Sequence, residues 1–301
     1  MSRNWYVILH IRPGPLYPDA KSPQIAAAAR FELSSEMWIE KLDTELAKQI
    51  QRACEPAHYN IDIDVWDRHL YAFVRDTTAQ ELPQYQGLNE LYTVIALSRL
   101  VHPTSTGERY CAKIFPLPEN SSPIQAIQPR GICPDVLLGD ASRDWLSPDD
   151  GLELRRLLPW VPSTKLMHRR VHRAFWNHEQ AMRSYYLDLR WNLVVSGLEA
   201  LVTVEGRNVM QQFIRRVGNL AADFGIPLTE PELRKAYELR SGLAHAQGFL
   251  YDFCTVLPSD EHKPLYDKLE SLLRATLKAS LLDETFGRNF ADKDAVRKRW
   301  P

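Results

Sequence analysis

The chain has 301 residues, of which 45% are hydrophobic and 25% are charged, and this composition is typical of a globular protein rather than a disordered one. Its 37 Lys and Arg are balanced by 38 Asp and Glu, so any attraction to nucleic acid has to come from a local basic patch. The four cysteines form no CxxC pair and no uncharged apolar window reaches the roughly 20 residues of a membrane span, so we expect a cytoplasmic protein with reduced thiols and no membrane partner.

The first half of the chain mixes strand and helix patterns. Helices are predicted at 34–53, with Ser34 or Ser35 as N-cap, and at 87–100. Strands are predicted at 4–11, 59–66, 70–74, 109–115 and 133–138, with a Pro-, Ser- and Gln-rich loop at 116–132. The sequence contains no P-loop, dinucleotide glycine fingerprint or nucleophile elbow. This half is therefore predicted to be an α+β domain with a regulatory or sensor role.

One pair of acids in this half has the spacing of metal ligands. Asp62 and Asp64 lie on the same face of the predicted strand at 59–66. Charges on the solvent-exposed face of a half-buried strand are a commoner reason for such a pair, so we expect no metal site.

The composition changes near residues 139–150, where turn formers and acids become frequent. Ser147 followed by Pro148 is typical of a helix start, with Ser147 as the cap. We therefore predict two domains, 1–145 and 146–301. Beyond the border the strand pattern ends, and a bundle of helices is predicted at 165–186, 187–204, 208–224, 230–246 and 261–289.

The helix predicted at 230–246 carries Arg240 and His245, five positions apart, and Gly248 is a plausible terminator. The spacing alone is weak, because Arg173 and His178 form a second such pair. The run Tyr237-Glu-Leu-Arg240-Ser241-Gly-Leu-Ala-His245, preceded by Ser196-Gly-Leu-Glu199-Ala-Leu-Val, resembles the Apea-like branch of the HEPN superfamily. The signature of that branch is an Arg, a polar residue, three more residues and a His.

The resemblance covers about the last 150 residues and implies an all-α HEPN helical bundle that forms a homodimer. It further implies a metal-independent RNA endonuclease, without a cofactor, in a bacterial antiphage (abortive infection) or toxin system. Possible partners are then RNA and an antitoxin or trigger protein. Some members of the family lack activity, so the alternative is a non-catalytic HEPN module that binds RNA, nucleotide or a partner protein.

The candidate catalytic residues are Arg240, His245, Ser241 and Glu199. His245 can transfer a proton near neutral pH, and Arg240 can bind a phosphate and stabilise its charge. Ser241 could contact the phosphate or position a side chain. Five residues advance a helix by about 500°, which leaves Arg240 and His245 roughly 140° apart, so a loosened turn or a symmetry mate is needed to bring them together. The alternative is that both residues only stabilise the helix end.

Glu199 lies in an apolar helix, where an unpaired carboxylate is costly, so we expect it to meet a cation, with Arg240 as first candidate. Whether this acid belongs to the active centre or only supports the Arg stays open. Between residues 155 and 190, eight Lys or Arg face two acids. This basic face either is a solvated helix surface or binds a single RNA strand, and the predicted RNA-binding residues are Arg169, Arg170, Arg173, Tyr185 and Tyr186. The basic tail at 293–299 is predicted to be a solvated chain end.

Overall fold

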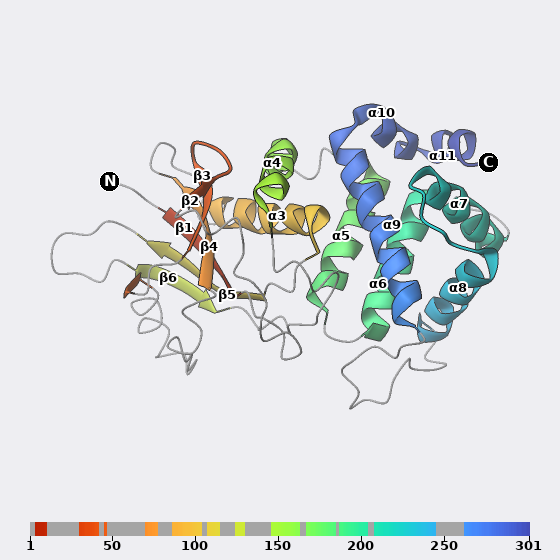
Figure 1. The fold of residues 1–301 in the computed structure, drawn as a ribbon, viewed down its shortest axis with the longest axis horizontal. Coiled ribbons are helices and arrows are strands. Elements are labelled where there is room, and N and C mark those ends of the chain that lie inside the picture. Colours follow the sequence, from red (N-terminus) through yellow and green to blue (C-terminus); the bar gives the residue numbers. More distant parts are fainter. Residues whose placement is uncertain are drawn as a thin grey trace. The chain divides into compact units, whose positions relative to one another are not determined.

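The structure is a computed structural model, and it consists of two compact units, residues 1–162 and 163–301 (Figure 1). It describes residues 4–10, 30–41, 45–46, 70–77, 86–103, 107–114, 124–129, 146–162, 167–184, 187–203, 208–244 and 262–301. Within these ranges, no helix has the length and hydropathy required to cross a membrane.

The first unit contains a six-stranded sheet with the order β2-β3-β4-β1-β5-β6, in which every neighbouring pair is antiparallel. The strands are β1 (Asn4–His10), β2 (Arg30–Glu32), β3 (Met37–Lys41), β4 (Leu70–Asp76), β5 (Gly107–Ile114) and β6 (Ile124–Pro129). The N-terminal strand β1 lies inside the sheet, where it pairs with both β4 and β5. Together with the helices below, the sheet confirms the α+β class.

Two helices complete this unit. Helix α3 (Gln86–Val101) is buried along most of its length and packs on β1 and β4. Helix α4 (Pro148–Leu157) begins as predicted: Ser147 Oγ accepts from Asp150 N at 3.2 Å, and Ser147 N donates to Asp150 Oδ2 at 2.7 Å. Helix α4 packs on α3, and Arg155 Nε donates to the carbonyl oxygen of Glu32 at 2.8 Å. The chain therefore divides after α4, C-terminal to the predicted border at 145/146.

The helix predicted at 34–53 is wrong at its start, because Met37–Lys41 forms strand β3. Met37, Trp38 and Ile39 are all buried, and their backbone pairs with both β2 and β4. Ser34 Oγ accepts from Glu36 N at 3.2 Å and from Met37 N at 3.1 Å, which closes a turn before the strand instead of capping a helix. Pairing with distant strands thus outweighs the local helical spacing.

The loop predicted at 116–132 is also wrong in part, because Ile124–Pro129 forms the edge strand β6 against β5. The predicted strands at 4–11, 70–74, 87–100 for the helix, and 109–115 correspond to β1, β4, α3 and β5. The strands predicted at 59–66 and 133–138, with Asp62 and Asp64, lie outside the described residues.

The second unit is a helical bundle. Its helices are α5 (Arg169–Arg183), α6 (Leu187–Val202), α7 (Val209–Asp223), α8 (Glu230–Ala244), α9 (Lys263–Leu282), α10 (Glu284–Gly287) and α11 (Lys293–Arg299). The helix predicted at 261–289 is interrupted at Asp283, whose carboxylate accepts from Thr285 N and Phe286 N and so begins α10. The other four predicted helices correspond to α5 to α8.

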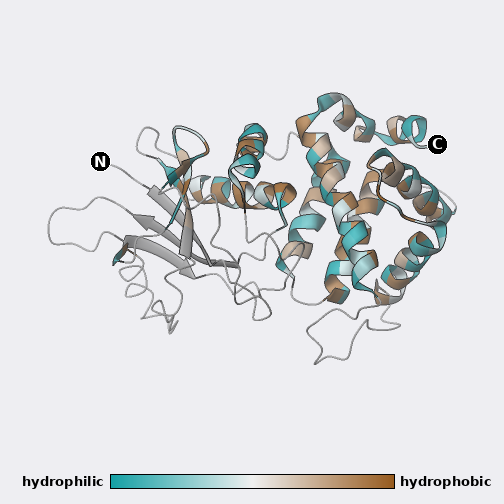
Figure 2. Ribbon diagram, viewed as in Figure 1, coloured by the Kyte–Doolittle hydropathy of each residue, from teal (hydrophilic) through white to brown (hydrophobic). Residues whose placement is uncertain are grey.

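Helix α6 lies in the centre of this bundle and packs against α5, α7, α8 and α9. Its buried side chains include Trp191, Val194 and Leu198, and Figure 2 shows hydrophobic residues along α6 and α9. Gly197 faces α9 so closely that an added Cβ would lie 2.7 Å from Leu273 Cδ2. The close approach of α6 and α9 at this point therefore requires glycine.

The end of the chain packs on α7. Trp300 is 1% exposed and stacks on Phe290 with ring centroids 5.0 Å apart. Its Nε1 donates to Asp223 Oδ2 at 3.0 Å, and its carbonyl oxygen accepts from Arg216 Nε at 2.9 Å. The prediction of a solvated basic tail is therefore wrong, because the segment forms α11 and a buried tryptophan fixes its end.

Candidate functional site

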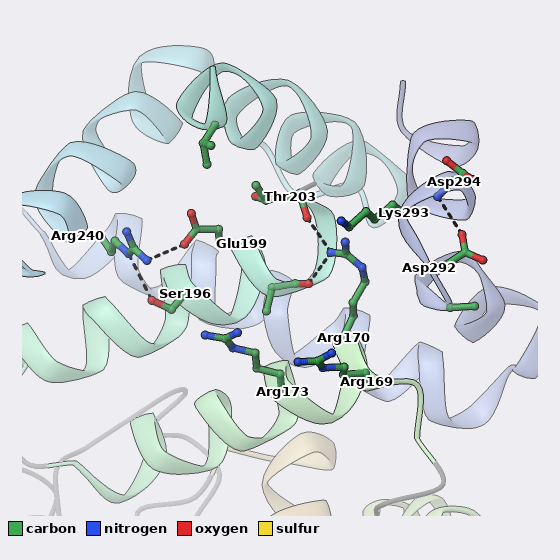
Figure 3. Close-up of a pocket in the computed structure, with 13 residues that line it drawn as sticks. Arg169, Arg170, Arg173, Ser196, Glu199, Thr203, Arg240, Asp292, Lys293 and Asp294 are labelled. Atoms are coloured by element: carbon green, nitrogen blue, oxygen red, sulfur yellow. Dashed lines mark hydrogen bonds and ion pairs between the residues drawn. The ribbon is translucent and has the colours of Figure 1, made fainter. Parts of the chain in front are cut away.

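A cavity of about 910 Å³ lies in the C-terminal unit, between α5, α6, α8 and the segment that contains α11 (Figure 3). Residues from four separate parts of the chain meet there. The lining residues that carry the chemistry are Arg169, Arg170, Arg173, Ser196, Glu199, Thr203, Arg240, Asp292, Lys293 and Asp294. The cavity thus brings together the two groups of residues that the sequence predicted separately, the Arg240–Glu199 group and the basic face of α5.

Arg240 and Glu199 form an ion pair across α8 and α6. Arg240 Nη2 donates to Glu199 Oε2 at 2.7 Å, and Arg240 Nε lies 3.4 Å from Ser196 Oγ. The two side chains are 26% and 19% exposed, so the pair is held between helices but remains accessible from the cavity. Among the described residues, none accepts a hydrogen bond from Arg240 Nη1. This nitrogen can therefore donate to an anion while the ion pair is kept.

The charge of the cavity is positive. Five of its lining side chains are cationic and three are carboxylates, which leaves a formal net charge of five minus three, or +2. The same excess of cations affects Arg216 behind the cavity: burial, followed by the charges of Arg215, Arg297 and Arg170, lowers the pKa of Arg216. An anionic ligand is therefore favoured over a cationic one.

Arg170 is committed to the fold. Its Nη1 donates to the carbonyl oxygens of Ala200 at 2.9 Å, Leu201 at 3.3 Å and Thr203 at 2.8 Å. Together with Arg216, whose Nη1 donates to the Val202 carbonyl at 3.1 Å, it satisfies the last carbonyls of α6 and offsets the negative end of the helix dipole. Arg170 consequently adds positive charge to the cavity but is not available for bidentate binding of a ligand.

Arg169 and Arg173 are available. Both are exposed, and Figure 3 shows them one turn apart on α5, at the cavity. Within the part of the chain that the structure describes, neither makes an ion pair or a side-chain hydrogen bond. Their guanidinium groups can therefore bind phosphate without losing an existing partner.

The same face of α5 continues past the cavity to Trp176. Positions 169, 173 and 176 are spaced by four and three residues, so their side chains form one stripe on the helix. Trp176 is 60% exposed. An exposed indole next to two free arginines is the combination that binds a single nucleic-acid strand, since the cations contact phosphates and the ring stacks on a base.

The second Arg–His pair of the sequence is separated by the fold. Arg173 lines the cavity, whereas His178 is fully buried and its Nε2 lies 3.1 Å from Glu270 Oε1. Burial by itself would raise the pKa of Glu270, but the hydrogen bond with His178 and the charge of Arg274 lower it overall. His178 and Glu270 thus belong to the core of the bundle and not to the cavity.

The remaining predicted residues have different outcomes. Helix α8 ends at Ala244, and the candidate His245 lies outside the described residues, as do Tyr185 and Tyr186. Ser241 lies on α8 next to Arg240 but does not line the cavity. The serine that contacts Arg240 is Ser196 on α6. Its spacing of three residues from Glu199 placed both side chains on one helix face, and this signal could have identified it.

Lys293, Asp292 and Asp294 also line the cavity and were not predicted as site residues. Only the packing of Trp300 brings this segment to α6, so no local pattern could have identified them. Among the described residues, no group of three His, Cys, Asp or Glu has the arrangement of a metal site. No family model, curated protein or solved structure matches the chain.

Proposed function

We propose that the C-terminal unit binds single-stranded RNA in the cavity and cleaves it without a metal ion, in a bacterial antiphage (abortive infection) or toxin role. One observation carries this proposal: Arg240 and the unpaired Arg169 and Arg173 come from helices far apart in the sequence and meet at a single cavity of positive charge. The resemblance to the Apea-like HEPN family supplies the reaction, and the geometry supplies a place for the phosphate.

In the proposed reaction, the ribose 2′-oxygen attacks the adjacent phosphorus. The O2′–P bond forms, the P–O5′ bond breaks, and the products are a 2′,3′-cyclic phosphate and a 5′-hydroxyl. Arg240 Nη1 and Arg173 bind the non-bridging oxygens and stabilise the extra negative charge in the transition state. Glu199 holds the Arg240 side chain in place from the other side. His245, which follows α8 directly in the sequence, takes the proton of the 2′-hydroxyl or gives one to the 5′-oxygen.

The chain is proposed to act as a homodimer. A spacing of five residues does not converge Arg240 and His245 on one ideal helix, so a second copy would supply the missing group. Light scattering at tens of micromolar is expected to give the mass of two chains. A monomer under these conditions contradicts the dimeric arrangement but leaves the RNA cavity untouched.

A second candidate function is a non-catalytic module that binds RNA, nucleotide or a partner protein in the same cavity. The Arg240–Glu199 ion pair favours it, because it gives Arg240 a structural role that needs no substrate. In that case the cavity binds its ligand through Arg169 and Arg173, and neither Arg240 nor His245 changes the ligand chemically.

Cleavage of labelled tRNA and mRNA in EDTA separates the two candidates. We expect the wild-type protein to cleave, and Arg240→Ala and His245→Ala to reduce the rate by about 100-fold or more, since positioned proton transfer is typically worth that much. Arg234→Ala is the matched control, because Arg234 lies on the same helix and pairs with Glu230 on the surface. A folded His245→Ala protein that cleaves at the wild-type rate contradicts catalysis, and binding without cleavage by any variant supports the module.

A further inference from the structure

We propose that the C-terminal segment 291–300 forms a wall of the RNA-binding cavity and that Lys293 binds a second phosphate of the strand, separate from the phosphate at Arg240. This inference rests on the proposed RNA-binding function. It adds that the site recognises a strand with at least two successive phosphates, and it assigns a role to a residue on a helix that lies about 50 positions beyond Arg240.

The wall is built into the fold. Ala291, Asp292, Lys293 and Asp294 all line the cavity, and the segment is fixed at its far end by the buried Trp300. Arg299 Nη2 adds an ion pair with Asp223 Oδ1 at 2.8 Å, so α11 is tied to the end of α7 by both of its last two described side chains before Pro301. These contacts place Lys293 at the cavity without any ligand.

The position of Lys293 is not explained by helix stability. It is the first residue of α11, where a cation meets the positive end of the helix dipole, whereas the other cations of the segment lie in the last turn, where the dipole favours them. Asp292 explains itself as the cap, since its Oδ1 accepts from Asp294 N at 2.9 Å and Ala295 N at 2.8 Å. A lysine in this place is accounted for by the cavity that it lines.

Two separate phosphate positions follow from the layout of the lining. Helix α6 runs along the cavity from Ser196, next to Arg240, to Thr203, next to Arg170 (Figure 3). Seven residues of helix span about 10 Å, which exceeds the reach of a single phosphate group. Lys293 lies at the Thr203 end in Figure 3, and Arg240 lies at the Ser196 end. A strand along α6 would therefore contact Arg240 with one phosphate and Lys293 with another.

The nearby carboxylates do not cancel this cation completely. Asp292 is engaged by two backbone amides, and Asp294 Oδ1 lies 3.3 Å from Arg297 Nη1. With all three acids counted, the lining still has an excess of two positive charges. Charge complementarity thus favours a polyanionic strand over a partner of mixed charge.

The test compares Lys293→Ala with Lys298→Ala, which removes the same charge from the same helix at a residue that does not line the cavity. Both lysines are exposed, so both variants should fold. The probe is a fluorescein-labelled single-stranded deoxyoligonucleotide of ten residues, which lacks the 2′-hydroxyl and cannot be cleaved. We expect Lys293→Ala to weaken binding about fivefold or more and to lower the salt slope of log K by about 0.7, the value for one phosphate of a single strand.

A double variant tests whether two phosphates are involved. If Lys293 and Arg240 contact different phosphates, the loss of affinity in Lys293→Ala/Arg240→Ala should equal the product of the two single losses, because effects at separate contacts add in free energy. A double variant no weaker than either single variant overturns the second phosphate. Equal affinities and salt slopes for Lys293→Ala and Lys298→Ala overturn the wall. Absence of binding by the wild-type protein to both this probe and RNA contradicts the proposed function itself.

Discussion

Arg240 on α8 and Glu199 on α6 are joined by an ion pair of 2.7 Å that opens onto the cavity, and this pair connects two helices that are 41 positions apart at these residues. Glu199 has two effects on a bound phosphate. It holds the guanidinium group in position, and its negative charge competes with the phosphate for that group. Affinity and cleavage rate therefore need not change in the same direction when Glu199 is replaced.

We expect Glu199→Gln to bind the non-cleavable strand several-fold more tightly than the wild type. The substitution raises the net charge of the cavity lining from +2 to +3, since one of the three carboxylates is removed. The cleavage rate is expected to fall at least tenfold, because the weaker neutral hydrogen bond holds Arg240 less firmly. Fluorescence anisotropy and single-turnover cleavage measure the two effects, and a variant with weaker binding and unchanged cleavage contradicts the role of Glu199 given above.

Arg170 and Arg173 should respond differently to replacement although both line the cavity. Arg170→Ala removes a charged donor from the last carbonyls of α6 and should lower the free energy of unfolding by about 2 kcal/mol. Arg173→Ala removes no described contact and should change stability by less than about 0.5 kcal/mol while weakening RNA binding. Thermal unfolding and anisotropy on both variants check this, and a stability loss confined to Arg173→Ala would be the opposite result.

Trp176→Ala should weaken binding of a single strand by about 5- to 150-fold, the loss that corresponds to one stacked base. Trp176→Phe should keep most of the affinity, because a smaller ring still stacks. Leu189→Ala serves as the control, since Leu189 is another exposed apolar side chain of this unit, at 48% exposure. If Trp176→Ala leaves RNA affinity unchanged but shifts the mass seen by light scattering, the indole belongs to a contact between copies of the chain.

The attachment of α8 should depend on pH. Glu232 Oε1 accepts from Lys268 Nζ at 2.7 Å, and its Oε2 accepts from Thr229 N at 2.7 Å. The hydrogen bond from Lys268, followed by that from the Thr229 backbone, lowers the pKa of Glu232 from 4.5 to about 2. A lowered pKa means that the contribution to stability is complete above pH 4.5 and is lost as pH falls through about 2.

Replacement of this carboxylate by an amide should remove that dependence. Glu232→Gln is expected to lower stability at pH 7 by about 1 kcal/mol, the usual value of a helix cap, and to flatten the fall in melting temperature below pH 4.5. Circular dichroism melts from pH 7 to pH 2 provide the measurement. A wild-type and variant pair with parallel acid profiles would show that Glu232 does not anchor α8.

The helices of the C-terminal unit could be predicted because their signals are local. Ser147 and Pro148 mark the start of α4, and the spacing of Leu233 and Ala236 on α8 matches the buried face of that helix. Strand β3 could not be predicted in this way. Its residues also fit a helical face, and they form a strand because β2 and β4 lie on either side of it.

The candidate site was predictable only where its residues lie on one helix. Glu199 was expected to meet Arg240, and the ion pair confirms it, because an acid in an apolar helix needs a cation. The difference between Arg170 and Arg173 was not predictable, since it depends on which arginine reaches the end of α6. Lys293 enters the cavity through the packing of Trp300 on α7, a contact that no sequence pattern describes.

Gly197 shows that the cavity can be adjusted from the opposite side of α6. Ser196 and Glu199 face the cavity, whereas Gly197 faces Leu273 with no room for a methyl group. Gly197→Ala would therefore displace either Leu273 or α6 itself by a few tenths of an ångström, without touching any residue that lines the cavity. Substitutions along the α6–α9 contact thus offer a way to vary how strongly Glu199 holds Arg240, so affinity for RNA could be graded by residues that never meet the ligand.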